Sequence, residues 1–90
     1  MKKWYFTARV NLLHNNGAGP QKKLLVSGVK EGDGDVFPLE HISDYIKMLC
    51  NRSLETQVHQ GTEIHFHILN QVIVRSDLTA APFEKCTIIA

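Results

Sequence analysis

The sequence has no long apolar run and only two cysteines among its 90 residues. No stretch approaches the ~18 apolar residues of a membrane-spanning helix, and the apolar segment after Lys3 is interrupted by Arg9 and Asn11, which argues against a signal peptide. We therefore expect a cytoplasmic protein that does not enter a membrane. In that compartment Cys50 and Cys86 are expected to be reduced packing residues rather than a disulfide.

Carboxylates are absent from the segment before Glu31, although this segment holds six basic side chains. From Glu31 to the end, nine acids face four basic residues, so the two parts carry charges of +6 and −5. Opposite charges on two parts of a small domain can pair internally, pair between subunits or attract a charged partner.

Ninety residues with an ordinary apolar content of 43% can build a core of their own, so we expect a single domain over residues 1–90. The longest regular pattern runs over residues 62–75, where the even positions are mostly apolar and the odd positions mostly polar. This alternation predicts one long strand whose even positions share the inner face. A tight hairpin at Asn70-Gln71 is disfavoured because glutamine is a poor residue for such turns.

The length of this strand is informative in itself. Fourteen residues span roughly 46 Å when extended, whereas a compact domain of this size is only about 30 Å across. The strand must therefore bend, carry a bulge or project toward a partner, and the pattern leaves open whether it is continuous, bulged or broken.

The N-terminal part of the sequence predicts a β-hairpin. Residues 4–13 alternate with an apolar even face, residues 15–20 have the composition of a loop, and residues 23–29 form the returning strand.

A helix is predicted after the glycine-rich break at 31–35. Pro38 suits the first position of a helix, and the apolar residues behind it are spaced to form one face. These residues are Leu39, Ile42, Ile46 and Leu49. Asn51 is the predicted end.

A short strand at 56–59 and a terminal edge strand at 86–90 complete the expected elements. The fold class is thus α+β, a small antiparallel β-sheet in β-β-α-β-β order with the long strand at 62–75 and one helix packed on one face. The face that the helix leaves bare would show four apolar residues, more than solvent alone requires. They are Tyr5, Leu13, Leu69 and Ile73.

His65 and His67 lie on one face of the long strand, a spacing that can direct two imidazoles at one metal ion. The sequence places no third ligand beside them, so we favour a solvated polar face and expect no metal and no cofactor. A metal-binding protein or enzyme that uses this strand remains an alternative.

Other motifs that carry chemistry fail on context. Gly17-Ala18-Gly19 is followed by Pro20 and a strand instead of the helix that a phosphate loop needs. Asp33 and Asp35 have the spacing of calcium ligands, but a phenylalanine occupies position 37. Neither cysteine lies in a context typical of a nucleophile, so we expect no enzyme.

The basic hairpin raises nucleic-acid binding as an alternative, with Tyr5 stacking on a base and Arg9, Lys22 and Lys23 contacting phosphates. No recognition-helix or RNA-binding signature is present, and a pI near 7.8 argues against a dominant phosphate footprint.

The preferred hypothesis is a small non-enzymatic protein-interaction module, an adaptor, inhibitor or regulatory subunit that presents sheet surface and edge to a protein with an acidic surface. The predicted binding residues are Tyr5, Arg9, Lys22, Lys23, Leu69 and Ile73.

We also expect a homodimer, because the long strand exceeds the estimated diameter and an exposed apolar edge is an aggregation hazard unless it is covered. The interface is predicted at the far half of the long strand or at the terminal strand beside it. Its residues are Val72, Ile73, Val74, Ile88 and Ile89.

Overall fold

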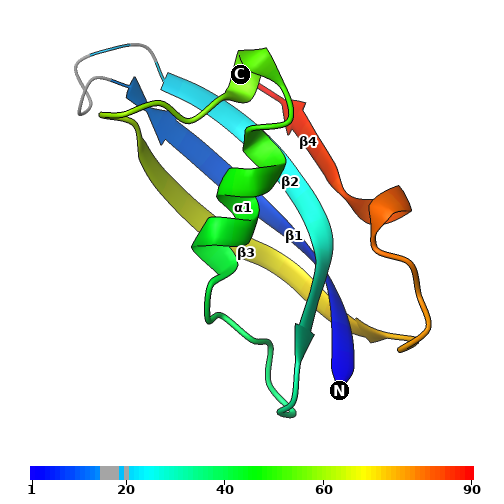
Figure 1. The fold of residues 1–90 in the computed structure, drawn as a ribbon. Helices are drawn as coiled ribbons and strands as arrows, with labels where there is room; N and C mark the ends of the chain where they lie inside the picture. Colours follow the sequence, from blue (N-terminus) through cyan, green and yellow to red (C-terminus); the bar gives the residue numbers. More distant parts are fainter. Residues whose placement is uncertain (15–18, 20) are drawn as a thin grey trace.

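A computed structural model describes residues 1–14, 19 and 21–90. Strands β1 (Lys2–Leu13), β2 (Gln21–Gly32), β3 (Glu63–Val74) and β4 (Lys85–Ile88) form one antiparallel sheet in the order β3-β1-β2-β4 (Figure 1). Helix α1 (Ile42–Cys50) packs on this sheet, so the predicted α+β class is confirmed. The predicted loop at 15–20 lies outside the described residues except for Gly19.

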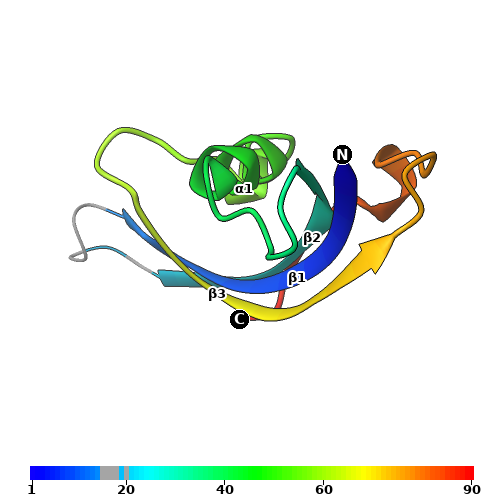
Figure 2. The same ribbon diagram turned by 90° about the horizontal axis from the view of Figure 1, so that it is seen from below.

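The sheet curves around the helix, which occupies its concave face (Figure 2). The predicted alternation of the first strand is confirmed, because every even position of β1 from Trp4 to Leu12 is buried. The apolar side of α1 covers them with Ile42, Ile46, Leu49 and Cys50. None of the helices in the described part of the chain is long and apolar enough to cross a membrane.

The predicted start of the helix is wrong. Helix α1 begins at Ile42, after His41 adopts a left-handed φ of 58°, and Leu39 is 60% exposed. Phe37, which is 7% exposed, takes the core position and meets Phe6 edge to face at a centroid distance of 5.5 Å. A phenylalanine buries more apolar surface than a leucine, and the turn before the helix delivers it to the core.

The end of the helix is as predicted, because Asn51 caps it and donates its N–H to the Lys47 carbonyl at 3.0 Å. The short strand predicted at 56–59 is wrong. Residues Leu54–Thr56 form a 3₁₀ turn, η2, and the Thr56 hydroxyl donates to the carbonyl of Cys50 at 2.6 Å. That hydrogen bond holds the chain against the end of the helix, so this segment does not extend as a strand.

The long strand is continuous but bulged. Ile68 pairs with Ala8 and Asn70 pairs with Thr7, so Leu69 is an extra residue without a partner on β1. Paired residues share a face, and the face therefore switches at the bulge. Beyond it Gln71 and Ile73 lie on the concave side, opposite Phe6 and Trp4, while Asn70, Val72 and Val74 lie on the convex side. The prediction that all even positions of this strand share the inner face is wrong for this far half.

The molecule is elongated, with extents of 41 × 22 × 20 Å. Three 12-residue strands run along it, so β3 fits within the length of the domain. The diameter estimated from chain length assumed a compact shape and is wrong, and strand length alone does not demand a partner.

Strand β4 pairs with β2, at the edge opposite β3. The prediction that the terminal strand lies beside the long strand is wrong. The connection between them passes over the convex face as the 3₁₀ turn η3 (Ala81–Phe83), where the Ser27 hydroxyl donates to the Phe83 carbonyl at 3.2 Å. The Phe83 and Tyr5 rings lie 6.0 Å apart, so part of the face that was expected to be bare is covered.

Candidate interaction site

Strand β3 forms an open edge of the sheet. It pairs with β1 on one side, and no described residue pairs with its other side. No β3 side chain is fully buried, whereas the neighbouring central strand buries every even position from Trp4 to Leu12. The difference arises because α1 lies over β1 and β2 and leaves the concave side of β3 partly uncovered (Figure 2).

A groove of about 440 Å³ lies between the middle of β3, at His67, Ile68 and Gln71, and the segment before α1. Its walls are mainly apolar, and Val36 and Leu39 are 78% and 60% exposed. The bulge at Leu69 contributes by turning Gln71 toward the concave side. We call this feature the β3 groove; its lining residues are Val36, Phe37, Leu39, Ile68 and Gln71, together with His67 at the strand edge, whose pairing with Arg9 places its side chain on the convex side.

The convex side of the same edge is polar and basic. Arg9 lies beside His67, while Asn11 separates His65 on β3 from Lys23 on β2. We call Arg9 and Lys23 the cationic cluster; His65 and His67 lie beside it, and all four side chains are exposed. Among the described residues, no carboxylate forms an ion pair with Arg9 or Lys23. Glu63, at the start of β3, lies 3.1 Å from His65 Nε2.

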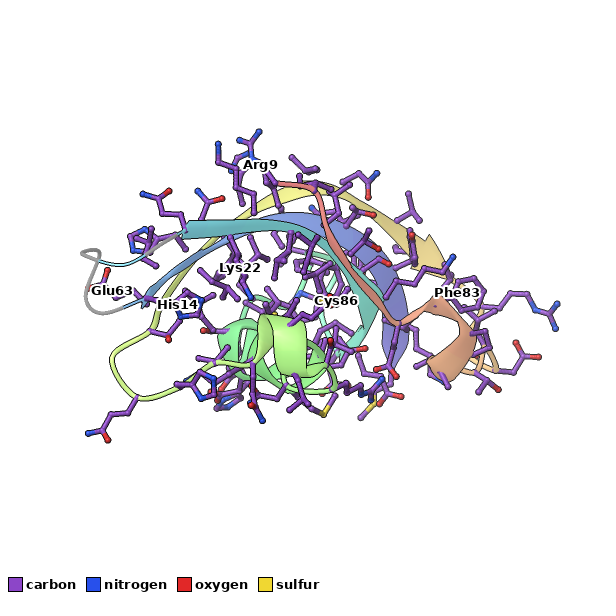
Figure 3. The ribbon with its side chains drawn as sticks, turned by 90° about the horizontal axis from the view of Figure 1, so that it is seen from above. Arg9, His14, Lys22, Glu63, Phe83 and Cys86 are labelled. Carbon is purple, nitrogen blue, oxygen red and sulfur yellow. The ribbon has the colours of Figure 1, made fainter. Side chains whose placement is uncertain are left out.

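The structure divides the predicted binding residues between two faces. Arg9 points away from the helix, whereas Lys22 lies on the helix side and its Nζ donates to the carbonyl of Glu55 (Figure 3). Ile73, half exposed, is turned to the concave side. Leu69 is half exposed at the bulge. Of the predicted binding residues, Arg9 and Lys23 lie near each other, on the convex face of the neighbouring strands β1 and β2.

The predicted dimer residues do not form one surface. Val72 and Val74 lie on the convex side of β3 and Ile73 on its concave side, whereas Ile88 and Ile89 lie at the opposite edge of the sheet.

The histidine strand shows no cluster of ligands, since no group of three side chains suited to a metal ion occurs among the described residues. His14 Nδ1 instead lies 3.0 Å from the Thr62 hydroxyl. That His65 and His67 bind no metal stays a prediction.

A hydrogen-bonded triad at the other edge was not predicted. The Tyr45 hydroxyl donates to Glu84 Oε2 at 2.6 Å and accepts the Val29 N–H at 3.2 Å, while Arg52 donates to Glu84 Oε1 at 3.0 Å. The hydrogen bond from Tyr45, reinforced by Arg52, outweighs burial and lowers the pKa of Glu84. Burial and the same carboxylate raise the pKa of Tyr45 to about 12. The triad fastens α1 to β2 and to the start of β4, which is a structural role.

The two cysteines meet where the end of α1 packs near β4. Both thiols are free, and Cys50 is buried while Cys86 is half-buried against the core. Hydrogen bonding with the Cys50 thiol lowers the pKa of Cys86 to about 7, and the same contact together with burial raises the pKa of Cys50.

The sequence did not reveal the β3 groove, because the helical spacing of Leu39 assigned it to the core. The parity of the apolar residues held a signal that could have found the bulge. Within residues 62–75 they occupy only even positions up to Ile68, and beyond it the odd positions Leu69 and Ile73 are apolar as well.

No family model matches this chain, and no curated protein and no solved structure is detectably similar to it.

Proposed function

We propose that this protein is a small non-enzymatic interaction module, an adaptor, inhibitor or regulatory subunit, that receives an extended segment of a protein partner along the edge of β3. The observation that carries the proposal is the combination of an open 12-residue edge strand with a mainly apolar groove beside the middle of that strand. Strand addition uses both features, because the backbone of the edge supplies hydrogen bonds and the flanking pocket takes alternate side chains.

The opposite edge is less suited to this role. Strand β4 has four residues, and its connection is held to the sheet and helix through Ser27 and the Tyr45–Glu84 hydrogen bond. We propose a cytoplasmic location, supported by the composition of the chain.

The test is affinity capture from the native host with quantitative mass spectrometry and nuclease-treated controls. We expect one protein to be retained by the wild type and by Leu54→Asp, and to be lost with Val36→Asp and Leu39→Asp. Leu54 is a matched control because it is an apolar side chain, 86% exposed, that lies outside the groove. Equal capture by all four proteins would contradict strand addition at β3.

Self-association is the second candidate. Val72 and Ile73 are 54% and 53% exposed in the far half of β3, beyond the bulge, and two copies whose edges paired there would set each of these side chains beside the second copy, one on each face of the joined sheet.

A third candidate, nucleic-acid binding, is favoured by the cationic cluster alone. Retention of nucleic acid that is abolished by Arg9→Glu would support it.

A further inference from the structure

We propose that the segment received by β3 is an extended acidic peptide in which apolar side chains alternate with aspartate or glutamate over about six residues, the length of an ordinary strand. The inference rests on the proposed strand addition at β3 and specifies its ligand.

The alternation follows from the geometry of an added strand. Successive side chains of a strand point to opposite faces, so a peptide paired with β3 would send every second side chain to the concave side and the others to the convex side. These two sides differ in chemistry over residues 63–68, where the pairing of β3 with β1 is regular.

The concave side selects apolar side chains. The β3 groove meets this half of the strand at His67 and Ile68, and its apolar walls are Val36, Phe37, Leu39 and Ile68. Val36 and Leu39 are 78% and 60% exposed, so they can be covered by an apolar side chain of the peptide. Covering them contributes roughly 25 cal/mol for each Å² of apolar surface removed from water.

The convex side selects acids. A peptide side chain there would meet His65 and His67 directly, with Arg9 one strand further in. Arg9 and Lys23 have no ion-pair partner among the described residues, so a carboxylate would gain attraction from Arg9, and at longer range from Lys23 on β2, without displacing a partner already present.

A second copy fits this half of β3 poorly. Strand β3 contains one carboxylate, Glu63, and its other convex side chains before the bulge are His65 and His67. Self-pairing here would therefore bring at most one carboxylate from the second copy to this face. The bulge at Leu69 then limits the complementary stretch, because beyond it the faces switch and the convex side becomes apolar at Val72.

The experiment is a selection from a displayed library of random peptides about 12 residues long, twice an ordinary strand. Enriched peptides should carry Asp or Glu at every second position with apolar residues between them. A synthetic copy of the most enriched peptide is then titrated by fluorescence anisotropy, beside a peptide of identical composition in which the acids form one block. The alternating peptide should bind at least ten times more tightly than the blocked one.

Variants on the convex and concave sides of the sheet test which side binds the acidic and which the apolar side chains of the peptide. The double change Arg9→Glu with Lys23→Glu should weaken the alternating peptide about tenfold and reduce its salt dependence, Leu39→Asp should weaken it at any salt concentration, and Leu54→Asp should leave it unchanged. All substituted residues are exposed, and circular dichroism checks that each variant is folded.

Two results would overturn the proposal: enriched peptides without alternating acids, or binding indifferent to charge reversal at Arg9 and Lys23. A single-stranded oligonucleotide whose binding falls with the charge reversal but ignores Leu39→Asp would assign the cationic cluster to nucleic acid instead. If native capture depends on Leu39 while the selected peptides are not acidic, strand addition stands and only its ligand is wrong.

Discussion

At the scale of single residues, Gly28 leaves the space into which Tyr45 packs against β2. A Cβ built on Gly28 would lie 2.7 Å from the Tyr45 hydroxyl oxygen, so the missing side chain is what lets the tyrosine reach the β2 backbone. Its ring also meets Phe6 edge to face, at a centroid distance of 5.9 Å. One glycine thus determines where the hydroxyl that binds Glu84 is placed.

The triad around Glu84 gives a prediction about acid stability. Its pKa in the folded chain is lowered from an ordinary value of 4.5, so the carboxylate stabilises the fold above that pH, and this contribution is lost as the pH falls through the lowered value. Tyr45→Phe should cost about 1–3 kcal/mol at neutral pH, because the Val29 N–H and Glu84 each lose a partner. It should also make the loss of stability in acid smaller.

Urea unfolding at pH 7 and at several values below 4.5 measures both effects. Glu40→Gln is the control, since the Glu40 side chain is 85% exposed. The same pH dependence in Tyr45→Phe and the wild type would show that this hydrogen bond does not lower the pKa of Glu84.

The two cysteines should differ in reactivity. Thiolates are the reactive form, so Cys86, with a pKa of about 7, should be alkylated by iodoacetamide at neutral pH at least ten times faster than the buried Cys50. Mass spectrometry of digested samples gives both rates. Cys50→Ala should raise the midpoint of the pH profile for Cys86 toward 9, and an unchanged midpoint would exclude the thiol contact as its cause.

At the scale of elements, the bulge yields a prediction about deletions. Removing Leu69 keeps every β1–β3 pair and the face of every other residue, so the free energy of unfolding should change by less than about 1 kcal/mol. Deleting Arg9 from β1 shifts the alternation on one side of the deletion, so the buried residues there turn to the convex face. This deletion should lower the free energy of unfolding by about 3 kcal/mol or more. Thermal unfolding of the two single deletions makes the comparison, and a severe loss with the Leu69 deletion would mean that the bulge itself stabilises the sheet.

The helix and strands also differ in how well the sequence predicts them. Strand β1 was predictable because its buried positions alternate with more exposed ones along its length, as its buried even positions show. The start of α1 was not predictable, because Leu39 has the spacing of a helical core residue. The turn at His41 instead buries Phe37 and leaves Leu39 exposed. The β3 groove depends on that turn, so local periodicity in the sequence could not predict the groove.

At the scale of the whole molecule, self-association is open to a direct measurement. If two copies pair through the far half of β3, light scattering at tens of micromolar should give about twice the 10.2 kDa of the chain. Val72→Asp should then give monomer, whereas Ile88→Asp, at the opposite edge, should not. A monomeric wild type would exclude the dimer and leave the whole β3 edge to another chain.

The strand order has a consequence for how quickly the chain reaches its native state. The first strand of the chain is an inner strand of the sheet, and its pairing with β3 joins Lys3 to Val74, which are far apart along the sequence. Among the strand pairs in the described part of the chain, β1–β2 is the one whose strands follow each other in the sequence, so it can close first. During synthesis on a ribosome the edge of β1 that later pairs with β3 stays open until β3 has been made. Such non-local pairing places folding in the range of milliseconds to seconds. During that interval β1 exposes the side where β3 later lies, which makes the nascent hairpin the form of this protein most prone to aggregation.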